Sequence, residues 1–284
     1  MIPAAFDYYR PTDMAGVLSL LEEHGDNARV MAGGHSLIPM MKLRMAEVPH
    51  LIDLQDVGGL SSIEIGSDGI KIGALVTQSE IIEHAGLADM APILREAALQ
   101  IADPQVRYMG TVGGNVANGD PGNDMPGLMQ CLDASFTVVG PDGERDISAR
   151  EFYEAAYMTA REDDEVLTAV TFPLPRGGFA YEKQKRKIGD YATAAAAVQI
   201  VKEGDTSTAA SIAMTNLSDT PVFSKEAGSA LVGTSVNAEA IKAAVLAMLG
   251  DIDPTEDNRG PIAFKNHVAG IILSRAIARA WSRA

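Results

Sequence analysis

The middle of the chain contains the run GTVGGNVANGDP at residues 110–121, which GND follows at 122–124. Glycines, amide side chains and carboxylates gather here with almost no positive charge. Main-chain N–H groups and the Thr111 hydroxyl can hold phosphates, and Asn118 or Asp124 can bond sugar hydroxyls. The run therefore predicts a site in which neutral donors bind phosphate and no lysine is needed.

A second glycine motif, Ala32-Gly33-Gly34-His35-Ser36, lies where the short apolar stretch Val30–Ala32 ends. Glycines let the main chain approach a ligand without Cβ clashes, so successive N–H groups can converge on an anion. A pyrophosphate would suit such a nest. The alternative is a tight turn that needs two glycines for its geometry alone, and the motif by itself leaves both interpretations open.

Neither glycine motif matches the patterns of the two common nucleotide folds. The spacing differs from G-x-G-x-x-G and from G-x-x-x-x-G-K-[ST], which argues against a Rossmann dinucleotide site and against a P-loop.

Composition sets further limits. The 284 residues carry a formal charge of −15 and are 46% hydrophobic, which indicates a globular protein of two or three domains and disfavours nucleic acid as a partner. The longest apolar stretch, Ala192–Val201, is too short to span a bilayer, and the N-terminus shows no secretory pattern. We therefore expect a cytoplasmic protein that does not cross the membrane.

Cysteine and histidine are scarce. Cys131 is the one cysteine, so an internal disulfide is excluded and any iron–sulfur cluster must lie on a partner. Its apolar neighbours predict a buried, inert thiol. The five histidines show no paired spacing, so no metal site is expected on this chain.

Periodicity predicts an α+β protein. The expected helices are 12–24, 36–44, 148–156, 224–231, 238–249 and 262–281, with another that opens at a capping box in Thr77–Glu80. The expected strands are 30–32, 51–54, 62–65, 69–72, 135–139, 166–172, 179–185, 192–201 and 208–215. Residues 102–126 lose this periodicity and are expected to form a long functional loop. Pro173–Gly178 is interpreted as a boundary between domains 1–177, with lobes of about 1–55 and 56–177, and 178–284.

The pair of glycine motifs resembles that of the flavin-binding subunits of the molybdenum hydroxylase family, where AGG-x-[ST] and T-[IV]-GG-N embrace the FAD pyrophosphate. The resemblance covers essentially the whole chain and is closest in the carbon monoxide dehydrogenase branch. The similar stretches are 1–8, 32–42, 101–130 and 183–197. It implies a PCMH-type FAD-binding fold of two lobes, plus a C-terminal domain with an antiparallel sheet and a helical bundle. Non-covalent FAD would lie between the lobes.

The resemblance also implies which residues contact FAD. They are Ala32, Gly33, Gly34, His35, Ser36, Leu37, Ile101, Thr111, Gly113, Gly114, Asn115, Asn118, Asp124, Leu167, Lys185 and Tyr191. Asp124 would contact ribityl or ribose hydroxyls, and Ile101 and Tyr191 would lie near the isoalloxazine. The alternative for Tyr191 is an ordinary half-buried strand residue. His35 lies inside the pyrophosphate turn, which argues against covalent attachment of the flavin.

The function implied is electron transfer. FAD on this chain would pass electrons from iron–sulfur clusters on a small subunit, fed by a molybdenum-cofactor large subunit, to an external acceptor such as a quinone. The assembly would be a dimer of heterotrimers, peripheral at the inner face of the membrane. No catalytic residue is expected on this chain itself. The alternatives are the FAD subunit of a related hydroxylase (aldehyde, purine, N-heterocycle or aromatic acyl-CoA) and a free-standing flavoprotein oxidase.

The chain also has a short basic run, Lys183, Lys185, Arg186 and Lys187. In a strand, such a run is expected to form a solvated face, and in so acidic a chain it could complement a partner subunit.

Overall fold

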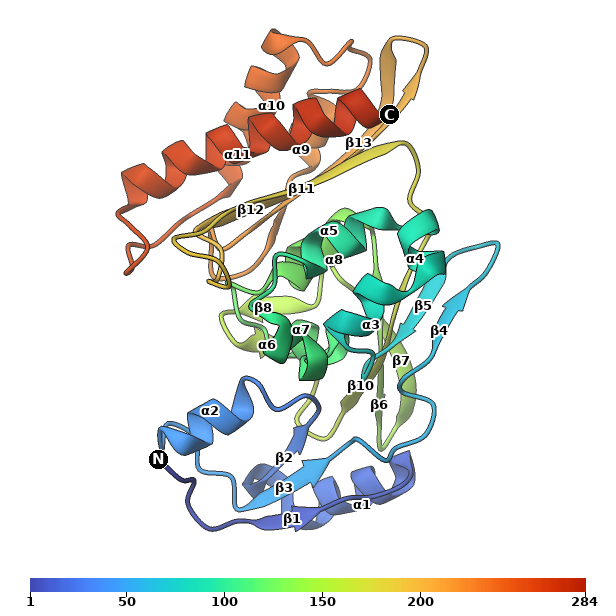
Figure 1. The fold of residues 1–284 in the computed structure, drawn as a ribbon, viewed down its shortest axis with the longest axis vertical. Coiled ribbons are helices and arrows are strands. Elements are labelled where there is room, and N and C mark those ends of the chain that lie inside the picture. Colours follow the sequence, from blue (N-terminus) through green and yellow to red (C-terminus); the bar gives the residue numbers. More distant parts are fainter.

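The computed structural model describes residues 1–284, which form three units stacked along the long axis of the molecule (Figure 1). The N-terminal unit lies at one end, the C-terminal unit at the other, and a mixed helix and sheet unit between them. The α+β class is confirmed.

The N-terminal unit is a small parallel sheet covered by helix α1. Its elements are β1 (Asp7–Tyr9), α1 (Met14–His24), the 3-10 turn η1 (Gly25–Asn27), β2 (Ala28–Met31), α2 (Leu37–Lys42) and β3 (His50–Asp53). The strand order is β1-β3-β2. The Asp13 carboxylate caps α1 by accepting from Gly16 N at 2.8 Å. Val17 and Leu21 then pack against Ile52 of β3 in one buried cluster.

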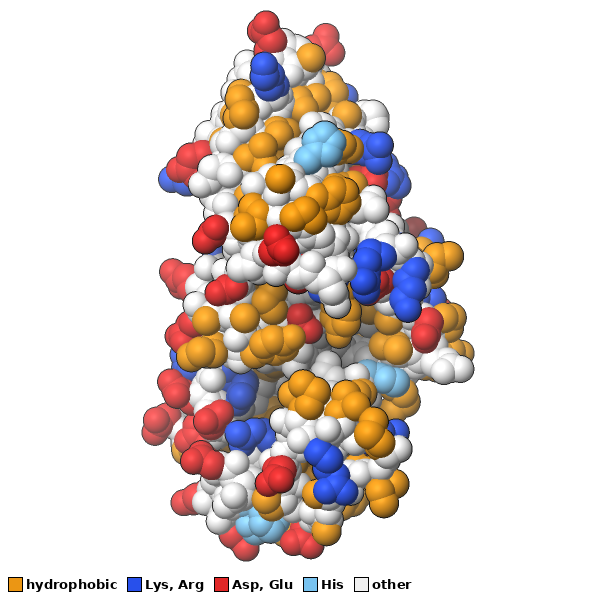
Figure 2. Space-filling view, turned by 90° about the vertical axis from the view of Figure 1, so that its left-hand side faces the viewer, with side chains coloured by type: hydrophobic (Ala, Val, Ile, Leu, Met, Phe, Trp, Pro, Cys, Tyr) orange, Lys and Arg blue, Asp and Glu red, His pale blue; other side chains and the backbone are white.

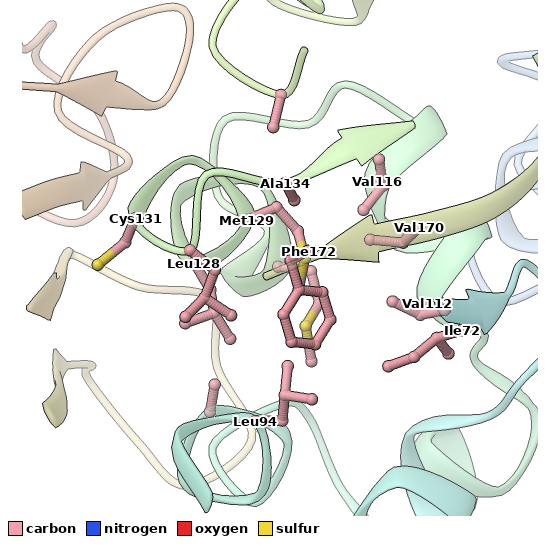
Figure 3. Packing of buried hydrophobic residues seen from close by; sticks show 14 of the residues in the cluster. Ile72, Leu94, Val112, Val116, Leu128, Met129, Cys131, Ala134, Val170 and Phe172 are labelled. Atoms are coloured by element: carbon pink, nitrogen blue, oxygen red, sulfur yellow. The ribbon is translucent and has the colours of Figure 1, made fainter. Parts of the chain in front are cut away.

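The middle unit combines a five-stranded antiparallel sheet, in the order β4-β5-β10-β6-β7, with six short helices. Its strands are β4 (Ile63–Ile65), β5 (Ile70–Gly73), β6 (Ser135–Gly140), β7 (Gly143–Ser148) and β10 (Val166–Phe172), with the separate hairpin β8 (Tyr153–Ala155) and β9 (Met158–Thr159). Its helices are α3 (Gln78–Glu83), α4 (Ala85–Met90), α5 (Pro92–Ala98), α6 (Pro104–Met109), α7 (Val112–Ala117) and α8 (Asp124–Cys131). Figure 3 shows Leu128 and Met129 of α8 packed with Phe172 of β10 in the core of this unit.

The C-terminal unit is a four-stranded antiparallel sheet that packs against three helices. It comprises β11 (Gly178–Gln184), β12 (Ala194–Glu203), β13 (Thr206–Thr215), β14 (Val222–Phe223), α9 (Lys225–Ser229), α10 (Ala238–Asp251) and α11 (Ile262–Arg283). Alternation along β12 gives each face of the sheet a different partner. Ala195 and Ala197 join the core of the middle unit, whereas Ala194 and Ala196 join the core beneath α10 and α11.

Arginines at the end of α11 fix the C-terminal unit on the middle unit. Arg279 pairs with Glu96 of α5 at 3.2 Å and with Glu182 of β11 at 2.5 Å, while Arg283 pairs with Glu96 at 2.7 Å. Tyr181 N also donates to Glu96 Oε2 at 3.2 Å. These bonds set where β11 lies relative to the helices of the middle unit.

Most expected elements are confirmed, including the capping box, in which Thr77 and Glu80 bond each other's main-chain N–H. The prediction of a long functional loop over 102–126 is wrong, because this segment forms α6, α7 and the start of α8. Each of the first two helices has a side-chain cap: Asp103 accepts from Val106 N and Thr111 from Gly114 N. Caps and burial stabilise short glycine-containing helices that lack an apolar period.

The expected helix over 148–156 is also wrong. Strand β7 ends at Ser148, and Ala149 N donates to Ala134 O at 2.8 Å. Phe152 is fully buried and meets the Phe136 ring edge-to-face at 4.8 Å between centroids. Burial of this aromatic side chain against the sheet outweighs the helical spacing of the segment.

Candidate functional site

A long cavity of about 520 Å³ lies where the N-terminal unit meets the middle unit. Figure 2 shows the surface hollowed between the lowest part of the molecule and the part above it. Segments from all three units line the cavity: the end of β2 with the start of α2, the region of α6 to α8, and Lys183 with Gly189–Tyr191. This volume falls within the range of small-molecule and cofactor sites.

The two glycine motifs lie side by side in this cavity. A Cβ on Gly33 would lie 2.0 Å from Met109 O and 3.0 Å from Gly110 Cα. Only glycine at position 33 therefore lets the first motif contact the main chain at the start of the second motif. A Cβ on Gly114 would lie 3.7 Å from Ala32 Cβ. The motifs, far apart in sequence, therefore form one wall.

The first motif presents a row of free donors. The main-chain N–H groups of residues 33–37 make no hydrogen bond within the protein, and Gly34 has a φ of +72° that turns the chain there. All five residues line the cavity. Consecutive unpaired N–H groups at a turn form an anion-binding concavity.

The second motif differs from expectation, because its N–H groups are already used inside the protein. Val112 N donates to Val76 O and Gly113 N to Ala74 O, both at 2.9 Å, and Gly114 N donates to Thr111 Oγ1 at 3.0 Å. These bonds fasten the start of α7 to the segment after β5. The second motif therefore offers the Thr111 hydroxyl hydrogen and a close-packed surface, while the free main-chain donors come from the first.

A buried ion pair forms part of the cavity wall beside α8. The Asp124 carboxylate accepts from Tyr181 Oη at 2.5 Å and from Lys183 Nζ at 2.8 Å, and the Lys183 side chain is only 1% exposed. Burial, followed by the nearby Asp124 charge, raises the pKa of Tyr181 well above its usual range, so the phenol stays protonated and donates. Asp124 keeps lone pairs for a ligand hydroxyl.

The expectation of a solvated basic face is therefore wrong for Lys183, which Asp124 and Gln100 O hold inside the protein. Lys185 donates to Gln100 Oε1 at 2.6 Å and does not line the cavity. Burial, and next the Lys183 charge, lower the pKa of Lys185. Lys183 of β11 and Lys185, which follows the end of the strand, both turn toward the middle unit, because the strand lies against its helices there.

Three further charged residues also line the cavity: Arg29, Arg161 and Glu165. Glu165 accepts from Arg145 Nε at 2.6 Å and Nη2 at 2.8 Å, and these bonds lower its pKa. Burial lowers the pKa of Arg161, whose guanidinium donates to Glu165 O at 2.8 Å. No sequence motif marks these residues.

Of the expected site residues, all except Lys185 line this one cavity. Ile101 and Leu167 supply buried apolar surface, and Tyr191 is 44% exposed, so its ring is only partly covered. Gln78 was missed by the sequence analysis: its side chain lines the cavity, is 1% exposed, and neither amide atom has a partner. Its position at the start of α3 gave no signal beyond the capping box.

Cys131 is buried as expected, and its thiol donates to Ser211 O at 3.4 Å. Burial raises its pKa to about 12. No group of three or more His, Cys, Asp or Glu side chains is arranged to hold a metal ion.

Comparison with known families matches the chain in two parts. Residues 4–175 match the model of the FAD binding domain in molybdopterin dehydrogenase, and residues 179–280 match the CO dehydrogenase flavoprotein C-terminal domain.

Individual relatives match over the full length. The chain is 51% identical to the carbon monoxide dehydrogenase medium chain of Afipia carboxidovorans and 41% identical to that of Hydrogenophaga pseudoflava, covering 100% of this chain and 99% of each relative. Reconstituted CO dehydrogenase from Oligotropha carboxidovorans superposes with a TM-score of 0.98 at 51% identity, and both chains are covered completely. Quinoline 2-oxidoreductase from Pseudomonas putida gives 0.95 at 30% identity, with 99% of each chain covered.

The fold, the paired glycine motifs and these matches agree. The chain belongs to the FAD-binding medium subunits of the molybdenum hydroxylases, and within them it is an oxidoreductase subunit of the carbon monoxide dehydrogenase type.

Proposed function

We propose that this chain holds FAD in the cavity between its first two units and serves as the electron-transfer subunit of a heterotrimeric carbon monoxide dehydrogenase. The observation that carries the proposal is the row of unpaired N–H groups at residues 33–37, which faces the cavity beside the Thr111 hydroxyl. A diphosphate supplies the acceptors that such a row lacks, without a lysine.

The chain's residues divide between the parts of the cofactor. The N–H groups of 33–37 and the Thr111 hydroxyl would bind the diphosphate. Asn118 and Asp124 would bond ribityl or ribose hydroxyls, and Ile101 would lie against the isoalloxazine with Tyr191 toward the outer surface. Gln78, whose buried amide has no partner, fits a polar ligand in the same cavity. Bound FAD would supply the capacity to accept and release electrons, and the protein would bind, orient and shield it.

Attachment of FAD would be non-covalent. His35 belongs to the row of diphosphate donors and is exposed, so its imidazole would be expected to meet phosphate or solvent. The mass of the denatured, FAD-loaded chain tests this: an unmodified mass supports the proposal, and an added flavin mass contradicts it.

The partners would be a large subunit with the molybdenum cofactor and a small subunit with iron–sulfur clusters, assembled as a dimer of heterotrimers. The 51% identity over the full medium chain of a carbon monoxide dehydrogenase supports this assembly. An external acceptor such as a quinone would take the electrons. None of the helices combines the length and apolar character that a membrane span needs, and we propose that the complex works in the cytoplasm at the inner face of the membrane.

The test compares the full chain alone with the chain co-expressed with its two partner subunits. The chain alone should bind FAD and keep its flavin absorbance under carbon monoxide. The complex should lose that absorbance under carbon monoxide without oxygen and regain it when a quinone is added. A complex with full cofactor content that carbon monoxide does not bleach would refute the assigned substrate.

A related hydroxylase is the second candidate, because quinoline 2-oxidoreductase shares the fold at a TM-score of 0.95 and the caffeine dehydrogenase beta subunit of a Pseudomonas species is 32% identical. Bleaching by an N-heterocycle, purine, aldehyde or aromatic acyl-CoA in place of carbon monoxide would identify it. Bleaching of the chain alone by a substrate would instead indicate a free-standing oxidase.

We also propose that residues 1–177 and 178–284 are separate domains. Limited proteolysis tests this boundary, because cleavage should concentrate in the segment Pro173–Gly178 and release two stable fragments. Cleavage elsewhere would contradict the division.

A further inference from the structure

One buried side chain of the cavity has no partner inside the protein. Gln78, the first residue of α3, lines the cavity and is 1% exposed, and neither its amide nitrogen nor its amide oxygen makes a hydrogen bond within the chain. Its main-chain N–H is already used, because it donates to Gly110 O at 2.9 Å. Buried polar groups in folded proteins are almost always paired, since an unpaired one costs free energy. The partner of this carboxamide is therefore sought in the ligand that fills the cavity.

The neighbours of Gln78 satisfy their own polar groups without its side chain. Thr77 and Glu80 cap α3 by bonding each other's main-chain N–H. Thr111, which forms a β-bridge with Thr77, accepts from Gly114 N through its hydroxyl at 3.0 Å. The Gln78 carboxamide thus neither caps α3 nor fastens it to α7, and no structural role accounts for its polarity.

The surroundings of Gln78 indicate which part of FAD it would face. Helix α3 packs against α6 (Figure 1), and Val106 of α6 lines the cavity together with Ile101, which precedes that helix and is buried. A Cβ on Gly189 would lie 3.2 Å from Ala102 O, so this apolar wall continues to the loop that contains Gly189. A flat aromatic ring fits such a wall, and the proposed function places the isoalloxazine there.

The chemistry of a carboxamide narrows the choice further. It offers a donor and an acceptor side by side, and it pairs best with an edge that carries both, as glutamine does with the edge of a base. Phosphate oxygens only accept, so a diphosphate would pair with Gln78 Nε2 and leave Oε1 unpaired. The pyrimidine edge of the isoalloxazine carries a carbonyl oxygen next to an N–H group, at N3, and would satisfy both atoms.

We infer that Gln78 is a cofactor-binding residue whose carboxamide pairs with the pyrimidine edge of the flavin. Nε2 donates to a flavin carbonyl oxygen, and Oε1 accepts from the flavin N3–H. This inference rests on the proposed function, since it assigns one further residue a role in the same cavity.

The test measures the binding of FAD, of its N3-methyl analogue and of ADP to the FAD-free full chain by isothermal titration calorimetry. The methyl group removes the N3–H donor, so the native chain should bind the analogue about tenfold or more weakly than FAD. ADP carries the adenine and the diphosphate without the flavin, and it reports on the rest of the cavity.

The main variant is Gln78→Met, which keeps the length of the side chain and removes both polar atoms. The Kd of FAD should rise by about 5- to 150-fold, the loss of two hydrogen bonds, while the Kd of ADP stays the same. FAD and its analogue should then bind within about threefold of each other, because the group that distinguishes them is gone. The melting temperature of the FAD-free variant should hold or rise, since two unpaired buried atoms are removed.

Gln130→Met is the matched control. Gln130 is also a buried glutamine, 4% exposed, and its Oε1 has no partner, but it does not line the cavity. This variant should leave the Kd of FAD and the weaker binding of the analogue unchanged.

Equal affinity of the native chain for FAD and for the N3-methyl analogue would overturn the inference and leave the proposed function standing. That comparison needs no variant, so it decides even if Gln78→Met does not fold. A higher Kd of ADP in Gln78→Met would assign the carboxamide to the adenine or the diphosphate, and unchanged FAD binding would assign it to water; either result would also overturn the inference. A native chain that binds neither FAD nor ADP would instead contradict the proposed function.

Discussion

Gly33→Ala perturbs the contact on which the cavity depends. The new Cβ would lie 2.0 Å from Met109 O, and real Cβ contacts stay beyond 3.0 Å, so the two segments must separate by about 1 Å. Overpacking of this kind costs about 1–3 kcal/mol. The separation displaces the free N–H groups of 33–37 from the Thr111 hydroxyl, so we expect FAD affinity to fall by about 5- to 150-fold, the equivalent of that free energy.

The assay is titration of the full chain with FAD, followed by quenching of flavin fluorescence, together with thermal unfolding. Gly58→Ala is the matched control, because a Cβ there meets nothing within 4 Å, and it should bind FAD normally. Gly114→Val should also abolish FAD binding while the chain stays largely folded, since its Cβ faces Thr111 Oγ1 at 2.9 Å and Ala32. Native affinity and native stability in Gly33→Ala would refute the reasoning that the two motifs touch and bind together.

Three other expectations concern buried charges and the thiol. Lys183→Met leaves the Asp124 carboxylate buried without its cation, so the free energy of unfolding in urea should fall by about 3–5 kcal/mol. A much smaller loss in the double variant that also carries Asp124→Asn would support the pairing. The pKa of the Cys131 thiol is about 12, against an ordinary 9.0. Its alkylation by iodoacetamide at about pH 8 should therefore be roughly a thousandfold slower than that of an ordinary thiol until the chain unfolds. Fast labelling of the native protein would contradict the burial of this thiol. The fold lowers the pKa of Glu165, so its contribution to stability is present above the ordinary pKa of 4.5 and is lost as the pH falls through the lowered pKa. Arg145→Met should therefore destabilise the chain at neutral pH and much less in strong acid. An equal loss of stability at both pH values would contradict the pairing.

The sequence indicated the two glycine motifs and their pairing, because the residue types needed for close main-chain approach are visible as letters. It could not indicate which N–H groups are free. That depends on acceptors from elsewhere in the chain: Val76 O and Ala74 O accept from the N–H groups of the second motif, whereas no acceptor pairs with the N–H groups of residues 33–37. The division of labour between the motifs is a tertiary property.

The burial of Lys183 is another tertiary property. Its partner, Asp124, lies 59 residues earlier at the start of α8, and the two meet only because β11 crosses the middle unit. Local patterns in the acidic chain therefore favoured a solvated lysine. The short helices over 102–126 are a different case, since Asp103 with Pro104 and Thr111 are readable start signals that the loss of apolar periodicity obscured.

The central claim is that one cavity, closed by the two glycine motifs, holds the cofactor's diphosphate. A crystal structure of the chain with FAD bound tests it most directly. We predict the diphosphate within hydrogen-bond distance of the N–H groups of residues 33–37 and of the Thr111 hydroxyl, with the isoalloxazine toward Tyr191. A diphosphate bound outside this cavity, with those N–H groups still unpaired, would contradict the account.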